Sequence, residues 1–549
     1  MGILLHSRLL LLLSFAVSAG AQAILTYQIA NNYNFIQPGL PNYGIAQGSI
    51  FALQGTSLAA SRASQGVPLQ TDLGGTEIAV TVNGTTTNAI PYYVSPQQIT
   101  AILPSKTPVG DGTVTVTSGG KQTASGPIHV VQSAFGLLTL PNLNVLNVAQ
   151  VQDASQGGKL LSLSNAANPG EFLTLWGSGL GPVSGDETQY QTPGNLTGPI
   201  EVDIGGVPAT VTYHGRSIYP GLDQINVIVP SGISGCSASL VVVAGGVPSN
   251  VATVPVPSSG RICSDPELIP LTPDEYQGLL SLDNVNTGFI SLVKLTTANA
   301  AAGSTTSDSA NAVFQSYTSQ QATSAGFLPQ TSIGSCITYI EGGPPPYFTA
   351  PVELNAGPQI NVSGPDGLLA LVRYAQIYPE PPDTSPPIIP PTGGTFTFDN
   401  GSGGPDVGPF TASLTVNLAN PLVWTNGSAI TAINRASGQQ ITWTGGIPGS
   451  YVSIYGYTFA HEYSPAANGS DVYTYLTCSA PISAGQFTIP AAVLESLMPS
   501  GTVLGGGLPP AGNGYLFVVN QTVQQFQAPG MDLGLILFGA GSGISVPFN

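Results

Sequence analysis

One motif occurs twice in this chain, and its repetition constrains the fold more than any other feature. Residues 98–105 read Gln-Ile-Thr-Ala-Ile-Leu-Pro-Ser, and residues 224–231 read Gln-Ile-Asn-Val-Ile-Val-Pro-Ser. The copies are 126 positions apart, and the Gly-Gly pairs at 119–120 and 245–246 keep the same spacing. Self-similarity over about a hundred residues is longer than a solenoid repeat, so it predicts a duplicated domain.

Both copies read as sets of short strands. Residues 113–117 (Thr-Val-Thr-Val-Thr) alternate with period two, which is the mark of a half-buried strand. Turns are predicted at Asn83-Gly84 and Asp111-Gly112. Five to seven short strands within about a hundred residues, joined by Gly and Pro turns, indicate a β-sandwich.

The second copy resembles the IPT/TIG-type immunoglobulin-like domains found in tandem in uncharacterised exported bacterial proteins. Four segments carry the resemblance: Asn168-Pro-Gly170, residues 176–180 (Trp-Gly-Ser-Gly-Leu), Gly205-Gly206, and residues 223–230 (Asp-Gln-Ile-Asn-Val-Ile-Val-Pro). The first copy departs from the pattern, because Gln47 precedes Gly48 in place of Pro, Ser57 replaces the second Gly, and Thr100 replaces the Asn. The resemblance implies two tandem immunoglobulin-like sandwiches. It says little about function, because such domains serve as spacers, adhesion modules and appendages to enzymes alike.

The N-terminus predicts export. Arg8 precedes an apolar run over residues 9–17, and small residues follow at Ala19, Ala21 and Ala23. This pattern predicts a signal peptide over residues 1–23, cleaved after Ala21 or Ala23. The run is shorter than the roughly 18 residues that a membrane span needs. We therefore expect a secreted or cell-surface protein with no transmembrane segment in the mature chain.

The charge excludes two classes of partner. Charged residues make up 7% of the chain, with Lys and Arg together numbering 10 against 27 Asp and Glu, whereas ordinary soluble domains are about 25% charged. Ten basic side chains are too few to neutralise the phosphates of a nucleic acid or an anionic membrane. Neither is therefore an expected partner. Hydrophobic residues reach 42%, which favours a folded chain over a disordered one.

The four cysteines predict disulfides. None lies in a Cys-x-x-Cys pair, so metal-ligand spacing is absent. An even number in an exported chain suggests two bridges. We favour Cys236–Cys263, at the end of the second repeat, and Cys336–Cys478, within the C-terminal half.

Residues 264–549 show no comparable repeat, and the proline-rich stretch 379–391 reads as an extended linker. The expected fold is all-β, with two tandem immunoglobulin-like β-sandwiches followed by a C-terminal β-sandwich region of one or two domains. The expected segments are a signal peptide 1–23, a first immunoglobulin-like domain 24–140, a second 141–262, a third β domain 263–378, a Pro-rich linker 379–392 and a C-terminal β domain 393–549.

Aromatic residues in two C-terminal strands suggest a binding surface. Tyr451, Tyr455 and Tyr457 share one face of their strand, and Tyr473 and Tyr475 share one face of the next. If the aliphatic faces form the core, the tyrosines form a half-exposed platform that suits sugar rings or a partner sheet. The alternative is that another layer covers the tyrosines.

Catalytic and metal motifs are weak. No Gly-x-Ser-x-Gly pentapeptide occurs, and after residue 23 no His has a second His at metal spacing. A Gly-rich turn with Asp399 and Asp406 could offer oxygen ligands to calcium, although it lacks the spacing of an EF-hand. No other cofactor is expected.

These features favour a non-catalytic exported protein for adhesion, scaffolding or binding, with a polysaccharide or a surface protein as partner. One alternative is a carbohydrate-binding or carbohydrate-active protein, with its site in the C-terminal half; an enzyme of this kind would need two carboxylates brought together in space. Another is a self-assembling fibre or surface-lattice subunit, since low charge and many strand edges favour association.

Overall fold

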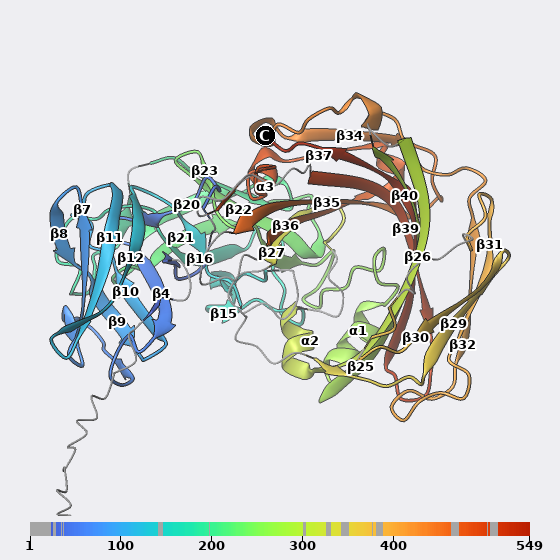
Figure 1. Ribbon diagram of the computed structural model, residues 1–549, viewed down its shortest axis with the longest axis horizontal. Coiled ribbons are helices and arrows are strands. Elements are labelled where there is room, and N and C mark those ends of the chain that lie inside the picture. Colours follow the sequence, from blue (N-terminus) through green and yellow to red (C-terminus); the bar gives the residue numbers. More distant parts are fainter. Residues whose placement is uncertain are drawn as a thin grey trace, which may run out of the picture.

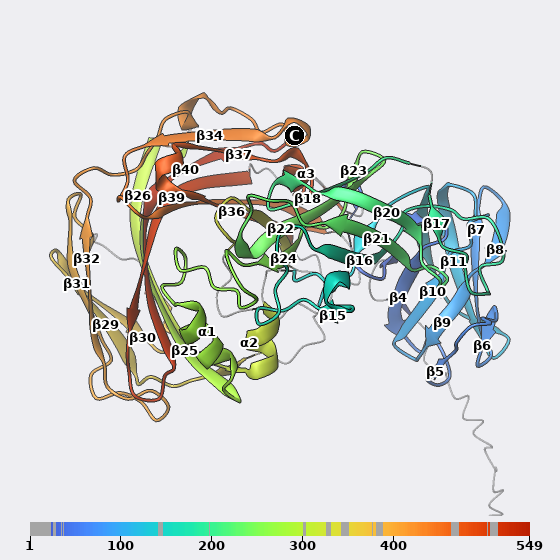
Figure 2. The ribbon, with the colours of Figure 1, turned by 180° about the vertical axis from the view of Figure 1, so that it is seen from behind.

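The computed structural model describes most of the chain after the predicted signal peptide, which itself lies outside the described residues. The described residues are 24–25, 29–34, 36, 38–140, 147–196, 198–299, 303–325, 331–341, 351–375, 377–379, 388–462, 471–501, 503–504 and 514–549. They form an all-β protein with several sandwich-like units in tandem. Two views place the second repeat between the first repeat and the C-terminal part (Figure 1, Figure 2).

The first repeat is a sandwich of two sheets that pack around Phe51, Leu53, Val80, Ile99 and Val114. One sheet contains β1 (Ile24–Leu25), β2 (Ala30–Asn31), β4 (Ile50–Thr56), β5 (Ala63–Ser64), β9 (Ile90–Val94) and β10 (Gln98–Ile102). The other contains β3 (Ile45–Ala46), β6 (Asp72–Leu73), β7 (Thr76–Val82), β8 (Thr85–Asn88), β11 (Gly110–Ser118) and β12 (Lys121–Val131).

The second repeat is built in the same way around Leu173, Leu175, Ile225, Val227 and Leu240. One sheet contains β13 (Gly136–Leu137), β14 (Val151–Asp153), β15 (Lys159–Leu160), β16 (Phe172–Ser178), β17 (Gly194–Asn195), β20 (Thr210–Arg216) and β21 (Asp223–Ile228). The other contains β18 (Ile200–Ile204), β19 (Val207–Pro208), β22 (Gly235–Ala244), β23 (Val247–Pro248) and β24 (Ala252–Val256). The duplicated motif forms β10 and β21, each of which pairs with strands on both sides.

A buried carboxylate links Gly179 and Asp223, two residues of the second repeat that the first repeat replaces with Ser57 and Gln97. Asp223 Oδ2 accepts hydrogen bonds from the backbone N–H groups of Gly179 (2.7 Å) and Leu180 (2.8 Å). Gly179 has φ +114°, and a Cβ there would lie 2.2 Å from the carbonyl oxygen of Ala134. Ser57, at the matching position of the first repeat, keeps a positive φ of 56°. Both repeats therefore need an unusual backbone conformation at this turn, and only the second requires glycine for space.

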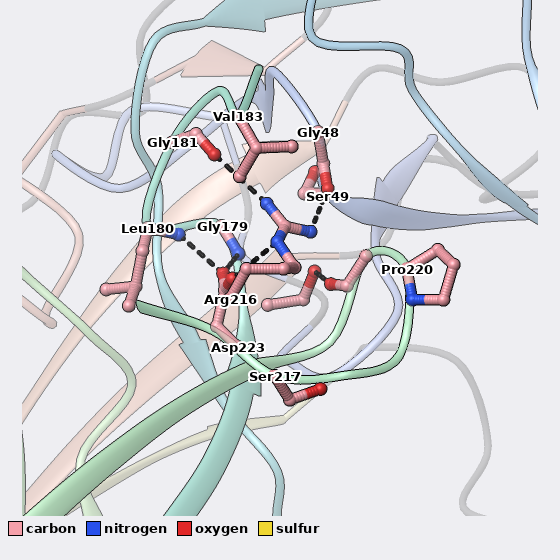
Figure 3. A network of polar contacts seen from close by, with 12 residues as sticks. Gly48, Ser49, Gly179, Leu180, Gly181, Val183, Arg216, Ser217, Pro220 and Asp223 are labelled. Atoms are coloured by element: carbon pink, nitrogen blue, oxygen red, sulfur yellow. Dashed lines mark hydrogen bonds and ion pairs between the residues drawn. The ribbon is translucent and has the colours of Figure 1, made fainter. Parts of the chain in front are cut away.

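A buried ion pair of the second repeat lies at its contact with the first repeat (Figure 3). Arg216 Nε lies 3.1 Å from Asp223 Oδ1, and the two side chains are only 3% and 0% exposed. Arg216 also donates from Nη1 to the Gly48 carbonyl of the first repeat (2.5 Å) and from Nη2 to the Gly181 carbonyl (3.0 Å). One guanidinium group therefore ties both repeats to the same buried carboxylate.

A nine-stranded sheet forms the centre of the C-terminal part. Its strands are β25 (Asn284–Asn299), β26 (Gly303–Thr318), β27 (Cys336–Glu341), β28 (Val352–Glu353), β35 (Tyr451–Glu462), β36 (Asp471–Pro481), β38 (Val503–Leu504), β39 (Gly514–Phe526) and β40 (Leu533–Val546). Two smaller sheets pack against it: β29 (Gln359–Gly364), β30 (Gly367–Val372), β31 (Gly393–Asp399) and β32 (Thr411–Asn417), and then β33 (Val423–Trp424), β34 (Gln439–Thr444) and β37 (Gln486–Ile489).

The nine-stranded sheet corrects the predicted division at residues 379–392. β25 lies before the proline-rich stretch and pairs in parallel with β40, which lies far beyond it. Near the end of the stretch, the Ile389 N–H donates to Asp308 Oδ2 (2.7 Å), and Lys294 Nζ donates to Asp308 Oδ1 (3.1 Å). The predicted separation into two β domains is therefore wrong, because non-local strand pairing unites both parts in one sheet.

A short helix begins at Pro273, shortly after the second repeat. α1 (Pro273–Leu280) has a capping box, in which the Thr272 hydroxyl accepts from the Glu275 N–H and the Glu275 carboxylate accepts from the Thr272 N–H. Tyr276 and Leu280, four residues apart, are buried on one face. The other α-helices are α2 (Ser319–Ala325) and α3 (Ala491–Leu494), and none of the described helices has the length and hydropathy to cross a membrane.

The second repeat also packs firmly on the C-terminal part. The Asp265 carboxylate accepts from the Cys236 N–H (2.9 Å) and from the Ser332 hydroxyl (2.7 Å). The Ser332 hydroxyl in turn accepts from the Ser237 N–H (2.7 Å). Polar contacts of short range thus join strand β22 to the segment that leads into β27.

Candidate functional site

Four tyrosines form one straight row across the nine-stranded sheet. The strand register places Tyr339 of β27 opposite Tyr475 of β36, Tyr475 opposite Tyr457 of β35, and Tyr457 opposite Tyr515 of β39. Successive ring centroids are 4.7, 5.9 and 5.0 Å apart. These separations lie close to the spacing of neighbouring strands, so the rings stack from strand to strand. We call this row the tyrosine ladder.

Three further rings flank the ladder on the same face. Tyr473 and Phe459 lie opposite each other with centroids 5.8 Å apart. Phe517 lies 6.2 Å from Tyr515, and its ring covers Gly543, where a Cβ would come within 2.3 Å of the ring. Glycine at 543 thus leaves the space that this aromatic ring fills.

The opposite face of the same strands is hydrophobic core. Ile454, Leu476 and Leu516 are fully or almost fully buried and pack in one cluster with Ile441 and Trp443 of β34. The smaller sheet with β34 and β37 lies over β35 in Figure 1. The four ladder tyrosines and the three flanking rings, by contrast, are all half-buried. The strands therefore have one packed face and one partly open aromatic face.

The geometry of the ladder determines which part of each ring can meet a ligand. The ring planes of Tyr339 and Tyr475 differ by 12°, and those of Tyr457 and Tyr515 by 21°. Nearly parallel neighbours occupy each other's faces, so the partly open surface consists mainly of ring edges and hydroxyl groups. Burial, together with the neighbouring Tyr515 and Tyr473, raises the pKa of Tyr457, which keeps its hydroxyl neutral at ordinary pH.

Two of the five predicted platform tyrosines differ from this description. Tyr451 is 2% exposed, so its predicted exposure is wrong. Tyr455 lies opposite Phe517, and its hydroxyl accepts a hydrogen bond from Gln521 Nε2. Burial raises the pKa of Tyr455. The structure brings Tyr457, Tyr473 and Tyr475 together, with Tyr455 at the inner edge of the group.

The sequence reasoning missed Tyr339 and Tyr515. Tyr339 lies more than a hundred positions before its partner Tyr475, and neither β27 nor the start of β39 carries a run of tyrosines. Each lies in a strand, where successive side chains point to opposite faces, and this alternation was the local signal that could have placed each ring on one face of its own strand. Only the strand order and register place them in the row.

The predicted calcium turn is folded by its own hydrogen bonds. Asp399 Oδ1 accepts from Asn361 Nδ2 (3.0 Å) and from the Gly401 N–H (3.1 Å). Asp406 Oδ2 accepts from the Asn355 N–H (2.8 Å). Each carboxylate thus shapes the turn, and calcium binding there stays a prediction.

The cysteines form two disulfides, Cys236–Cys263 and Cys336–Cys478. The latter joins directly opposite residues of β27 and β36, three positions from the ladder pair at Tyr339. Among the described residues, one group of three acidic, His or Cys side chains lies close enough to share a metal, and it contains both sulfurs of the Cys236–Cys263 bridge. Disulfide sulfurs are not thiolate ligands, so this group is structural.

Two carboxylates do come together, in the second repeat. Arg261 donates to Asp153 Oδ2 (3.0 Å) and to both carboxylate oxygens of Glu171. Burial raises the pKa of Asp153. Burial is also the largest single influence on Glu171, but the hydrogen bonds from Arg261 and from the Asn168 N–H together outweigh it and lower the pKa of Glu171. The shared guanidinium fixes the end of the repeat, and this is not the C-terminal carboxylate site that an enzyme would need.

No family model and no curated protein matches this chain. Solved structures similar to it include a tetra-tandem repeat from the extending region of a large adhesion protein, with 14% identity over 95% of this chain and 99% of that chain and a TM-score of 0.13. SGBP-B from a complex xyloglucan utilization locus in Bacteroides uniformis has 10% identity over 84% and 86% of the two chains and a TM-score of 0.17.

The extracellular region of plexin A4 has 15% identity and a TM-score of 0.15. This chain covers 20% of that protein, and the match extends over 45% of this chain. TM-scores this low carry no argument about function.

Proposed function

We propose that this protein is a non-catalytic, exported binding protein and that the tyrosine ladder contacts its ligand, a neutral polysaccharide. One observation carries the proposal. Seven aromatic rings gather on the half-buried face of strands whose other face is already a complete core. Aromatic side chains placed outside the core combine apolar area with polar hydroxyl groups, which is the composition of many binding surfaces.

The charge of the chain favours a neutral ligand. The formal net charge is −17, so a polyanion would be repelled over a long range. The ladder itself contributes hydroxyl groups that can donate to and accept from sugar hydroxyls. The tandem repeats then serve as a rigid support, because buried polar contacts join the first repeat to the second and the second to the C-terminal part.

The proposal includes the finer assignments that the sequence suggests. The two repeats are IPT/TIG-type domains, supported by the role of Asp223 in the Gly-x-Gly-Leu turn. The chain is secreted or held at a cell surface, supported by the signal-peptide pattern and by two disulfides, which persist in oxidising compartments.

The test is retention of the mature protein on a panel of neutral polysaccharides in affinity electrophoresis. Tyr457→Ala combined with Tyr475→Ala should weaken retention about 10- to 100-fold, since each aromatic contact contributes about 0.5–1.5 kcal/mol. Phe172→Ala is the matched control, because Phe172 is 48% exposed and lies in the second repeat. Equal retention of the double variant and the control would refute the role of the ladder.

A second candidate function is self-association, and the edge strand β30 favours it. β30 pairs with β29 on one side only, so its other edge is open to a further strand within the described part of that sheet. It exposes Leu368 (65%) and Val372 (59%), with Tyr374 (75%) just beyond. Open apolar edges pair readily with other chains. Concentration-dependent sedimentation that Leu368→Lys abolishes would support this role over the monomeric binder.

A further inference from the structure

The loop that joins β20 to β21 is rigidly held at the contact between the two repeats. Its ends are the buried Arg216 and Asp223, and the Ser217 N–H donates to the Leu222 carbonyl to close it. The Gly221 carbonyl accepts from the Ser178 hydroxyl (2.6 Å). A Cβ on Gly221 would come within 2.6 Å of the Ile50 side chain of the first repeat. The loop therefore has little freedom to move while the repeats are docked.

The same loop exposes large side chains at its tip. Ile218 is 47% exposed and Tyr219 is 46% exposed, although the Tyr219 N–H donates to the Ser217 hydroxyl and the Tyr219 carbonyl accepts from the Leu222 N–H. Tyr190, 63% exposed, lies beside them with its ring 6.1 Å from that of Tyr219. The Gln191 N–H donates to the Ile218 carbonyl (2.8 Å), which fixes the two segments to each other.

The first repeat contributes a third tyrosine. The Tyr92 hydroxyl of β9 donates to the Pro220 carbonyl of the loop (2.9 Å). Burial raises the pKa of Tyr92 to about 12, and the Tyr190 and Tyr219 hydroxyls add to the rise while Arg216 opposes it. Tyr92 thus contacts the loop that carries Tyr219, and the Tyr219 ring lies beside that of Tyr190. We call Tyr92, Tyr190, Ile218 and Tyr219 the joint patch, and neither repeat carries it alone.

The joint patch presents its rings differently from the ladder. The Tyr190 and Tyr219 planes are inclined by 62°, in an edge-to-face arrangement. Such a pair covers one face of one ring and leaves other ring faces open, whereas the nearly parallel ladder rings cover each other. Open faces on a fixed loop can stack on a ligand without first being ordered, so less binding free energy is lost on association.

From these contacts we infer that the joint patch is a second binding surface, which takes a neutral carbohydrate chain by stacking sugar rings on Tyr190 and Tyr219. The patch contains no Asp, Glu, Lys, Arg or His side chain, so it offers no ionic partner to a charged ligand. The neighbouring Gln65 and Gln191 amide groups donate to backbone carbonyls of the segments that form the patch, so they brace these segments, and the tyrosine hydroxyl groups are the polar groups of the patch. Ile218 is its one aliphatic member, and the tyrosines combine apolar ring faces with hydroxyl groups, which suits the apolar and polar surfaces of a sugar ring.

The inference extends the proposed function to a site that does not share a residue with the ladder. Two surfaces on one rigid chain can engage one polymer together, and such linkage raises retention by about 10²- to 10⁴-fold over either surface alone when the geometry permits both contacts. Removing either surface by a pair of Tyr→Ala substitutions should therefore reduce retention on the polysaccharide by more than the loss of a single weak site would.

The test uses the mature full-length chain on neutral polysaccharides, with gelatin and collagen as protein matrices. We compare Tyr190→Ala/Tyr219→Ala, Tyr457→Ala/Tyr475→Ala and Phe172→Ala with wild type by affinity electrophoresis. The Tyr190 and Tyr219 side chains are exposed, so the first variant should keep the wild-type melting temperature. We expect it to lose at least tenfold in retention on the same polysaccharide that the ladder variant releases.

The outcomes separate the two claims. Wild-type retention by the Tyr190→Ala/Tyr219→Ala variant, together with loss by the ladder variant, would overturn the joint patch and leave the proposed function standing. The reverse pattern would support the joint patch and overturn the ladder. A second measurement is the emission of Tyr219→Trp, which should shift on addition of the retained polysaccharide. A shift with gelatin or collagen alone, or no retention of wild type on any polysaccharide, would overturn the inference.

Discussion

The buried pair of Arg216 and Asp223 yields the sharpest prediction. Asp223→Asn keeps an oxygen that can accept from the Gly179 and Leu180 N–H groups but removes the charge that faces a guanidinium only 3% exposed. Breaking a buried ion pair from one side destabilises by about 3–5 kcal/mol, because an uncompensated charge stays buried. The Gly48 carbonyl still accepts from Arg216, so we expect a loss near the lower limit, about 3 kcal/mol.

The assay is amide hydrogen exchange of the turn that contains Gly179 and Leu180. A chain with several packed units does not unfold in two states, so a global midpoint would not report this site cleanly. A local loss of about 3 kcal/mol corresponds to roughly a hundredfold faster exchange, since about 1.4 kcal/mol is a factor of ten. Peptides from the nine-stranded sheet should exchange as in wild type.

Two further variants test whether the buried ion pair stabilises the turn. Asp111→Asn breaks the pair with His129, whose side chains are 91% and 39% exposed, and exposed pairs contribute at most about 1 kcal/mol. Its exchange should therefore change less than tenfold. Arg216→Met combined with Asp223→Asn removes both charges. The amide groups of the turn should exchange more slowly in this double variant than the summed free-energy losses of the two single variants imply. If Asp223→Asn behaves like Asp111→Asn, the buried pair does not hold the repeats together.

The other predictions concern a turn, a disulfide and a buried acid. Gly179→Ala should destabilise the second repeat by at least about 2 kcal/mol, because the new methyl group meets the Ala134 carbonyl; unchanged exchange there would contradict the clash. Cys336→Ser with Cys478→Ser opens a loop with a sequence separation of 142 and should lower stability by about 5 kcal/mol in guanidinium titrations. Wild type under reductant, which loses both disulfides, should be destabilised at least as much, and unchanged stability of the variant would contradict this role of the bridge. Burial raises the pKa of Asp265, so the contribution of this group to stability is complete below about pH 4 and is lost as the pH rises through the raised pKa. Asp265→Asn should therefore reduce the fall of the unfolding free energy with rising pH. If the free energy falls as steeply in the variant as in wild type, Asp265 is not the group responsible.

The sequence alone determines the local features of this structure, namely its strands and its repeated domain. Period-two alternation predicts the strands, and the spacing of the repeated motif predicts two like domains, because both depend only on which side chains share a face. The same alternation correctly places Tyr457 and Tyr475 on the faces opposite Ile454 and Leu476. The capping box at Thr272 was equally readable as a helix start, since its signal lies within four residues.

Tertiary structure decided the rest through contacts between distant residues. The tyrosine row needs β27, β36, β35 and β39 in one order and register, and no local pattern specifies which strand becomes whose neighbour. Tyr451 follows the same alternation as Tyr457 yet is buried, because the packing around it and not its own strand sets its exposure. The parallel pairing of β25 with β40 overrides the boundary that the prolines suggest, since hydrogen bonding between strands does not depend on their separation in sequence.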